Sequence, residues 1–546
     1  MTRAAMISRS RGEPAAAAEA PAAGARDADP RDDFLEREFA MHNDSKGDSA
    51  GALHPDRLLP ADPGTRAIAR RLYNTVRALP IVSPHGHTDP RWFADNAPFT
   101  DPVSLLLTPD HYITRMLYSQ GVGLEDLGVK PLARTAATRP LPGIAAAAPA
   151  GGSVPGCDSP GSPLDPRAIW RIFARHYHLF RGTPTRLWVD WVLSAVFETE
   201  APLTPGNADR AYERIAERLA QDAFRPRALF ERFGIEVLAT TESPLDELTS
   251  HAAIRASGWK GRVISAYRPD PVVDPEAPDF AASLVRLGEL TGEDTHTWRG
   301  YLAAHRARRA FFAQMGATST DHGHPTARTA DLGEREAQSL FDRIVRAAQS
   351  EVVEAADAEA FRAQMLTEMA RMSLEDGLVM QIHPGSWRNH NSFLYERFGP
   401  NMGADIPTAT DYVGALRPLL ERFGNERSLT LIVFTLDEST YSRELAPLAG
   451  HYPALKLGPA WWFNDSPEGL MRFREQTTET AGFYNTVGFN DDTRAFLSIP
   501  ARHDAARRID CAFLARLVAE HRLPEDEAAA VARDLAYNLP KRAYKL

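Results

Sequence analysis

The chain contains 546 residues, of which 43% are hydrophobic and 25% are charged, an ordinary composition for a globular protein. The formal net charge of −10 argues against a nucleic-acid-binding surface, and the sequence lacks the run of about 18 apolar residues that a membrane-spanning helix needs. The two cysteines, Cys157 and Cys511, cannot build a disulfide framework. We therefore expect a protein of the reducing cytoplasm.

The folded region is predicted to occupy residues 51–546. Residues 1–50 are rich in alanine and charged residues and poor in large apolar ones, which predicts a disordered tail. Apolar residues spaced as on one helix face indicate a helix over residues 65–79. The apolar run at Ile81 and Val82 follows as the first strand.

Two unlike segments come after this strand. Residues 130–163 are rich in alanine, glycine and proline, which predicts a flexible loop. Residues 166–230 combine helical spacing with many tryptophan and phenylalanine residues. We interpret them as a helical subdomain inserted after the first strand.

Seven further short apolar runs end in polar or charged residues. They cover residues 235–242, 263–268, 316–322, 378–383, 429–435, 454–458 and 484–492. Helical patterns, for example over residues 364–375 and 467–480, separate most of them. Eight strands alternating with helices predict the α/β class and a (β/α)8 TIM-like barrel. A doubly wound open sheet is the alternative, although no glycine-rich phosphate loop supports it.

Three His-x-His pairs occur in the sequence, and their contexts differ. His85 and His87 follow a strand, where residues two apart point the same way and can hold a divalent metal together. His176 and His178 lie in a helical pattern, where such residues diverge. His322 and His324 follow another strand-like run and remain candidates.

Polar residues end six of the predicted strands. They are His87, Glu242, Arg268, His322, His383 and Asp492. The carboxyl ends of barrel strands form the active-site mouth, so these residues are catalytic candidates.

Several longer segments resemble one known family. They are Asp110-His111-Tyr112 with Arg115, Tyr267-Arg268-Pro269-Asp270, Ser319-Thr320-Asp321-His322-Gly323, His383 with Arg388-Asn389, Trp461-Trp462-Phe463-Asn464-Asp465, Asp492-Thr493-Arg494 with Phe496-Leu497-Ser498, and Pro540-Lys541-Arg542-Ala543-Tyr544. They occur in the order found in the uronate isomerases (glucuronate isomerases) of the amidohydrolase superfamily. The resemblance covers nearly all of the chain from about residue 58 onward.

The resemblance implies an aldose–ketose isomerase that interconverts D-glucuronate with D-fructuronate and D-galacturonate with D-tagaturonate. It implies one divalent metal ion, zinc first and manganese or another ion otherwise, held by His85, His87 and Asp492. Asp492, or a metal-bound hydroxide that it orients, is also the expected general base, and Tyr112 the expected partner acid or polarising donor. His383 is expected to be a loose metal ligand or a hydrogen-bond donor to the substrate.

The substrate carboxylate needs an arginine, whose planar fork binds a carboxylate through two hydrogen bonds. We rank Arg494 first, then Arg268, then Arg388. Trp461 and Trp462 are expected to form a wall of the sugar pocket. Asn464 and Asp465 are expected to bind hydroxyls, and His322 to contact the substrate.

Two other functions stay open at this point. The first is a metal-dependent hydrolase of a lactone, amide or ester on the same scaffold, although the lysine that often bridges two metals on strand four is missing beside Asp321 and His322. The second is a sugar-acid binding protein without turnover. In each case we expect a small-molecule partner and a homo-oligomer, without nucleic acid or membrane.

Overall fold

The computed structural model describes residues 53–132, 165–277, 279–349 and 353–546. The predicted tail over residues 1–50 and almost all of the predicted loop over residues 130–163 lie outside the described residues. Within the described part of the chain, no helix combines the length and the apolar character needed to cross a bilayer.

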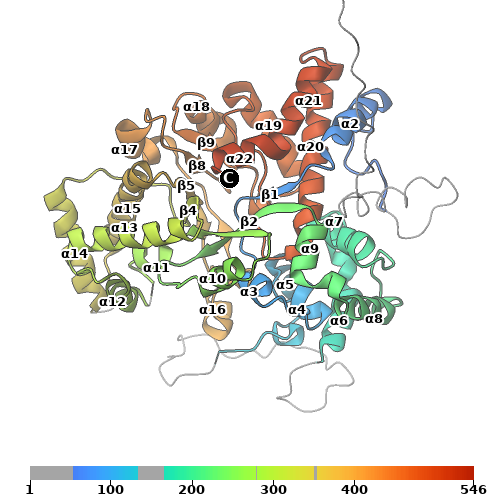
Figure 1. Ribbon diagram of the computed structural model, residues 1–546, viewed down its shortest axis with the longest axis horizontal. Coiled ribbons are helices and arrows are strands. Elements are labelled where there is room, and N and C mark those ends of the chain that lie inside the picture. Colours follow the sequence, from blue (N-terminus) through green and yellow to red (C-terminus); the bar gives the residue numbers. More distant parts are fainter. Residues whose placement is uncertain (1–52, 133–164, 278, 350–352) are drawn as a thin grey trace, which may run out of the picture.

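Seven parallel strands form the central sheet (Figure 1). They are β1 (Ile81–Ser83), β2 (Ile235–Glu242), β3 (Arg262–Tyr267), β4 (Ser319–His322), β5 (Val379–Ile382), β8 (Leu431–Val433) and β9 (Leu455–Leu457). Each strand pairs in parallel with the next one in this order. A doubly wound sheet would reverse its strand order at a switch point, so the sequential order excludes that alternative and gives a TIM-like barrel.

The segment predicted as the eighth strand, residues 484–492, is not a regular strand. Thr486 forms one isolated parallel bridge with Leu457, and the backbone N–H of His87 donates to the carbonyl of Thr493 over 3.0 Å. The backbone turns at Gly488, where φ is +79° and a Cβ atom would lie 2.5 Å from the Leu535 carbonyl oxygen. The prediction of a continuous strand is therefore wrong, although this segment occupies the eighth position.

Helices cover the outside of the sheet (Figure 1). They are α10 (Thr249–Ala256), α11 (Asp270–Val273), α12 (Phe280–Thr291), α13 (Trp298–Gln314), α14 (Glu334–Gln349), α15 (Ala355–Asp376), α17 (Val413–Phe423), α18 (Ala446–Ala449), α19 (Pro467–Ala481) and α20 (Ile499–Ala519). A π-helix, η5 (Tyr441–Leu445), precedes α18, and two short 3-10 helices, η6 (Trp462–Asn464) and η7 (Phe496–Ser498), precede α19 and α20. Their apolar faces and the strands form the largest core cluster.

The described chain between β1 and β2 is helical. Its elements are α3 (Pro90–Asp95), α4 (Pro102–Leu106), α5 (His111–Ser119), η1 (Glu125–Leu127), α6 (Pro166–His176), η2 (Tyr177–Phe180), α7 (Pro184–Trp191), η3 (Val192–Val196), α8 (Ala208–Leu219), η4 (Asp222–Phe224) and α9 (Pro226–Arg232). Buried aromatic residues such as Trp170 and Phe173 form its core.

The second His-x-His pair belongs to this helical region. His176 Nδ1 lies 2.9 Å from the Ile172 carbonyl oxygen, and His178 Nδ1 lies 3.1 Å from that of Arg175. Each imidazole therefore contacts the backbone of its own turn, which agrees with the divergence that helical spacing predicts.

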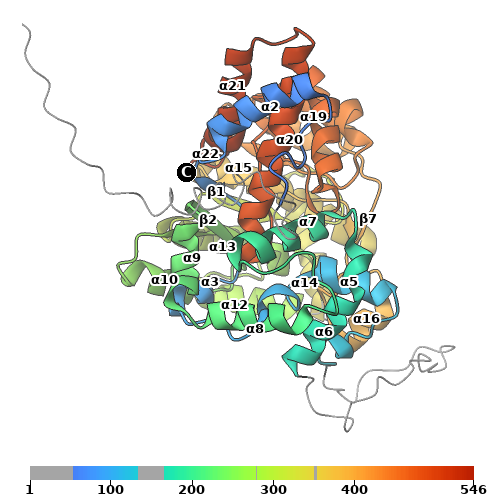
Figure 2. The same ribbon diagram turned by 90° about the vertical axis from the view of Figure 1, so that its right-hand side faces the viewer.

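The first helix of the described chain packs against helices near its C-terminal end, beside the barrel. Figure 2 shows α2 (Pro63–Val76) packed alongside α20 and α21 (Glu525–Arg533). The helix predicted over residues 65–79 begins earlier, because Asp62 accepts a hydrogen bond from the Thr65 N–H over 2.7 Å and caps it. The chain then passes through η8 (Asp534–Asn538) and α22 (Leu539–Ala543) and ends close to β1 (Figure 1).

One small unit was absent from the sequence prediction. After β5 the chain forms an antiparallel pair, β6 (Ser386–Trp387) with β7 (Ile406–Pro407), and α16 (Ser392–Phe398) lies between them in the chain. Strands of two residues carry too little pattern to be detected by periodicity.

Candidate active site

A cavity of about 660 Å³ opens at the carboxyl ends of the barrel strands. The predicted site residues that line it are His85, His87, Tyr112, Arg268, His383, Arg388, Trp461, Trp462, Asp492 and Arg494. Those on the sheet side follow β1, β3, β5 and β6, and the others belong to the eighth segment, to α5 of the helical insertion and to the start of η6. Four residues named in the sequence analysis as catalytic or substrate-binding candidates do not line this cavity, and they are Glu242, His322, Asn464 and Asp465.

Three of these side chains form a group that could hold a metal ion. The ligand atoms of His85, His383 and Asp492 all lie within 4.8 Å of one another. His383 Nε2 and Asp492 Oδ1 are buried and have no hydrogen-bond partner among the described residues. Buried polar atoms without partners are costly, and a divalent ion bound between them would satisfy both.

His87 lies at the edge of the same group. Its Nε2 atom is 3.1 Å from Asp492 Oδ1, and His85 Nε2 is 3.4 Å from that same oxygen. The set predicted from sequence (His85, His87, Asp492) and the set found by proximity (His85, His383, Asp492) therefore share two members.

Charge and burial favour the protonation states that a metal site requires. Burial lowers the pKa of His85 to about 4, so its imidazole is neutral near pH 7. Burial alone would raise the pKa of Asp492, but His85 and His87 hold it well below its ordinary value. Neutral imidazoles beside an ionised carboxylate are the forms that bind metal.

A buried ion-pair chain fixes the orientation of His383. Its Nδ1 atom lies 2.6 Å from Asp321 Oδ1, and Asp321 Oδ2 accepts a hydrogen bond from Arg268 Nη1 over 2.8 Å. Burial would raise the pKa of Asp321, but Arg268 and His383 hold it well below its ordinary value. With the Nδ1 proton directed at Asp321, Nε2 presents its lone pair to the cavity.

Asp321, and not His322, is therefore the strand-four residue at the site. His322 is buried outside the cavity, with Nε2 3.0 Å from Thr320 Oγ1. Neighbouring strand residues face opposite sides, so only one of this pair can point inward. This geometry gives no support to the substrate contact predicted for His322, whose side chain does not line the cavity.

The three candidate arginines differ in what already binds them. Arg268 bonds two carboxylates, since its Nε also donates to Asp270 Oδ2 over 2.8 Å. Arg388 donates to Asp405 Oδ2 over 3.0 Å. Arg494 donates to Asn401 Oδ1 over 2.9 Å and pairs with no carboxylate among the described residues.

Aromatic residues form one wall of the cavity. Trp461 meets the His383 ring edge-on, with centroids 4.8 Å apart, and the Arg388 guanidinium lies 5.1 Å from the Trp462 ring centroid. The Tyr112 hydroxyl donates to the Trp462 carbonyl oxygen over 3.1 Å. This bond joins the helical insertion to the loop that follows β9.

The residues after the tryptophan pair do not reach the cavity. Asn464 is buried and its Nδ2 donates to the Leu436 carbonyl oxygen over 3.4 Å. Asp465 forms a buried ion pair with Arg502, whose guanidinium lies 3.5 Å from the Trp188 ring centroid. Neither side chain lines the cavity, so this geometry gives no support to the hydroxyl contacts predicted for Asn464 and Asp465.

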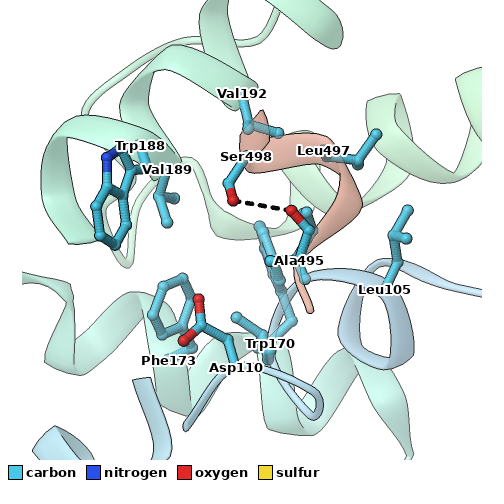
Figure 3. Close-up of a pocket in the computed structure, with 12 residues that line it drawn as sticks. Leu105, Asp110, Trp170, Phe173, Trp188, Val189, Val192, Ala495, Leu497 and Ser498 are labelled. Atoms are coloured by element: carbon cyan, nitrogen blue, oxygen red, sulfur yellow. Dashed lines mark hydrogen bonds between the residues drawn. The ribbon is translucent and has the colours of Figure 1, made fainter. Parts of the chain in front are cut away.

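A smaller cavity of about 20 Å³ lies behind this site (Figure 3). Asp110 borders both cavities, and its carboxylate accepts a hydrogen bond from the Tyr112 N–H over 2.9 Å. Figure 3 shows aromatic side chains, among them Trp170 and Trp188, around the rest of this space. It has room for about one water molecule, so Asp110 serves to position Tyr112 and does not open a second binding site.

The sequence analysis did not identify the residues that bind Arg388 and Arg494. Asp405 and Asn401 come from the β6–β7 unit and line the cavity beside Arg388 and Arg494. Neither belongs to a motif or follows a predicted strand, so no sequence signal marks them.

Comparison with known proteins agrees with this fold and shows the family of the chain. A family model described as Glucuronate isomerase matches residues 64–128 and 163–544. A uronate isomerase of Phenylobacterium zucineum is 67% identical over 494 residues, which are 90% of this chain and 97% of that protein. A second, from Xanthomonas axonopodis pv. citri, is 65% identical and is covered to 99%.

Solved structures give the same result. The crystal structure of glucuronate isomerase from Caulobacter crescentus superimposes with a TM-score of 0.83 at 60% identity, covering 90% of this chain and 97% of that one. A uronate isomerase structure from Thermotoga maritima, at 24% identity, has a TM-score of 0.79 over 90% of this chain and 99% of that one, and shows the shared fold. The chain belongs to the glucuronate isomerase family.

Proposed function

We propose that this protein interconverts aldohexuronates and ketohexuronates, namely D-glucuronate with D-fructuronate and D-galacturonate with D-tagaturonate. The observation that carries the proposal is the convergence of His85, His383 and Asp492 within 4.8 Å, in a cavity that also holds Arg494 without a carboxylate partner among the described residues. Membership of the glucuronate isomerase family supports the same reaction.

One divalent ion, zinc first and manganese as the second choice, fits this site. His85, His87, His383 and Asp492 would hold it, since neutral imidazoles with a carboxylate suit both ions. When bound, the ion polarises the substrate carbonyl and stabilises the negative charge that develops on its oxygen.

Arg494 binds the substrate carboxylate in this proposal. Its guanidinium is partly desolvated, and desolvation strengthens a charge-assisted hydrogen bond. Arg388 lies on the adjacent wall, and Arg268 remains with Asp270 and Asp321. The C–H face of the sugar packs against Trp461 and Trp462.

Isomerisation moves one proton between two neighbouring carbon atoms. The Asp492 carboxylate takes the proton from C2 of the aldose and returns it to C1, and the enediol between these steps is planar at both carbons. One hydroxyl proton also moves, from the oxygen on C2 to the oxygen on C1. The Tyr112 hydroxyl carries it, for which it turns from the Trp462 carbonyl oxygen toward the substrate.

The metal-dependent hydrolase is not proposed here. A two-metal hydrolase of this superfamily would use a lysine near the end of strand four, whereas the inward residue there is Asp321, bound by Arg268 and His383.

The test is an assay of purified protein with each aldohexuronate, before and after chelation. We expect ketose to form from D-glucuronate or D-galacturonate, to stop after the chelator, and to return with Zn²⁺ or Mn²⁺. Turnover that survives complete metal removal would reject the metal site. Absence of ketose from both substrates with metal restored would reject the reaction.

A further inference from the structure

The last tyrosine of the chain lies inside the barrel. Tyr544 follows α22 and is fully buried, and the C-terminus lies at the centre of the strands in Figure 1. Its ring packs in a cluster with Val379, Ile432 and Val487. The sequence motif that ends in this residue has no part in the chemistry described above, so its position calls for an explanation.

The Tyr544 hydroxyl joins two elements that carry site residues. It donates to Gln381 Oε1 over 2.9 Å and accepts from Asn490 Nδ2 over 3.2 Å. Gln381 lies two residues before His383, and Asn490 lies two residues before Asp492. The hydroxyl therefore connects the two stretches of backbone that present these candidate ligands.

The hydrogen bonds around Tyr544 and Gln381 continue to strand four. Gln381 Nε2 donates to the Thr320 carbonyl oxygen and to Ser319 Oγ, each over 3.3 Å. Ser319 lies two residues before Asp321, which binds His383. A polar layer in the barrel interior thus lies one step below His383, Asp492 and Asp321.

The eighth segment needs such support more than the regular strands do. It has one isolated bridge, at Thr486, in place of a ladder, and Asp492 has a φ of +36°. A left-handed conformation costs a non-glycine residue about 1–3 kcal/mol and persists only where the surroundings fix it. Asp491 Oδ2 lies 3.0 Å from His503 Nε2. Asn490 is bound by the Tyr544 hydroxyl, which also binds Gln381 of β5.

We propose that Tyr544 is a positioning residue, which sets the spacing between His383 and Asp492 and thereby the affinity of the site for its metal ion. The inference rests on the metal site of the proposed function. It assigns a role to the C-terminal motif that neither the fold nor the reaction requires by itself.

The experiment compares Tyr544→Phe with Tyr301→Phe in the full-length protein. Tyr301 is a matched control, since it is also fully buried, its hydroxyl donates to the Val272 carbonyl oxygen over 2.7 Å, and neither residue lines the cavity or contacts a candidate metal ligand. Each change removes only a hydroxyl. The readouts are the dissociation constant for Zn²⁺, by competition with a chelating dye, the Tm without metal, and kcat and KM separately.

We expect Tyr544→Phe to weaken Zn²⁺ binding about 10- to 100-fold, the range found for residues that support metal ligands, and to lower kcat with little change in KM. Tyr301→Phe should lower the Tm similarly and leave Zn²⁺ binding unchanged. Equal Zn²⁺ affinity in the two variants would overturn the inference.

A second variant covers the case in which Tyr544→Phe does not fold. Asn490→Leu removes the same bridge and keeps the tyrosine, so it should weaken Zn²⁺ binding to a similar degree, and in the double variant the two effects should not add. Unchanged affinity in Asn490→Leu would also overturn the inference. A wild-type protein that binds Zn²⁺ but converts no uronate would refute the proposed reaction alone, because these affinities need no substrate.

Discussion

The Asp492 carboxylate lies close to both histidines that follow the first strand. Its Oδ1 atom lies 3.1 Å from His87 Nε2 and 3.4 Å from His85 Nε2, and its backbone has left-handed geometry. The proposed mechanism gives this carboxylate two tasks, metal ligation and proton transfer. Loss of its charge should therefore affect catalysis far more than stability.

We expect Asp492→Asn to lower kcat/KM by at least about 10²-fold, since general base catalysis alone contributes about 10²- to 10⁴-fold. His85→Ala should have an effect of the same order through loss of a metal ligand. Steady-state kinetics, with circular dichroism to verify folding, tests both changes. Near-normal turnover in either folded variant would contradict the assignment.

Arg494 differs from the other cavity arginines because no described carboxylate neutralises it. We expect Arg494→Ala to lower kcat/KM for D-glucuronate by about 10²-fold, from loss of a charge-assisted pair worth about 1.5–3 kcal/mol per hydrogen bond. Arg494→Lys should recover little, because an ammonium group cannot form the planar two-bond contact.

The matched substrate for this variant is a neutral aldose that lacks the carboxylate. Its slow turnover should be the same in wild-type and Arg494→Ala protein. An equal loss with both substrates would show that Arg494 supports the site generally and does not read the carboxylate. Arg472→Ala, which breaks only a surface pair with Glu438, serves as the control substitution.

At the scale of elements, the first turn of α5 orients Tyr112. Asp110 caps this helix by accepting from the Tyr112 N–H, and Asp101 caps α4 in the same way, accepting from the Val103 and Ser104 N–H groups over 2.8 and 2.9 Å. Loss of a cap costs about 0.5–2 kcal/mol. The two caps offer similar stability but differ in their distance from the cavity.

We therefore expect Asp110→Ala and Asp101→Ala to destabilise the protein comparably, by about 1 kcal/mol. Asp110→Ala alone should also lower kcat, because the Tyr112 backbone loses its anchor. Chemical denaturation and kinetics on the same preparations separate the two effects. Equal kcat values in the two variants would argue against a catalytic role for the orientation of Tyr112.

The sequence predicts where a short strand lies, but it does not tell which of two neighbouring residues faces the barrel interior. The run that ends in Asp321 and His322 is visible as a strand, but a strand of four residues has no pattern that tells which face is inward. The prediction placed His322 at the site, whereas the structure places Asp321 there. The two histidines that follow β1 avoid this ambiguity, because His85 and His87 are two residues apart and were expected on the same face.

At the scale of the whole molecule, the barrel was predictable because strand and helix patterns are local. Contacts between distant segments were not. Tyr112 reaches the Trp462 carbonyl oxygen across 350 residues of sequence, and Arg494 reaches Asn401 across 93. Pairings of this kind depend on how loops pack against each other, and no periodicity encodes them. The homo-oligomer and the cytoplasmic location stay predictions.

Buried neutral histidines make the stability of the whole protein depend on pH. Burial lowers the pKa of His251 to about 4 and that of His305 to about 3, against about 6.5 in an unfolded chain. Between these values the unfolded state binds more protons, so the free energy of unfolding decreases as pH falls below 6.5. Each such histidine contributes a slope of about 1.4 kcal/mol per pH unit.

Between pH 6 and 4, we expect His305→Gln to reduce the number of protons taken up on unfolding by about one. The slope of the free energy of unfolding against pH should fall accordingly. Tyr267→Phe is the matched control, because it removes the contact of 2.7 Å to His305 Nδ1 and keeps the imidazole that titrates. Urea unfolding at a series of pH values measures the slope. A slope in His305→Gln equal to that of the wild type would contradict the assignment.

The closure of the barrel between its first strand and its last segment also bears on how the enzyme is made. During translation, His85 and His87 are synthesised early. Asp492, which faces them, and Tyr544, which lies below Asp492, are synthesised near the end of the chain. A nascent chain that stops before residue 490 lacks Asp492, the only carboxylate among the four proposed ligands, and Tyr544 below it. If the proposed metal site is correct, we expect an unfinished chain to bind the ion more weakly than the complete protein, because the charged ligand is synthesised last.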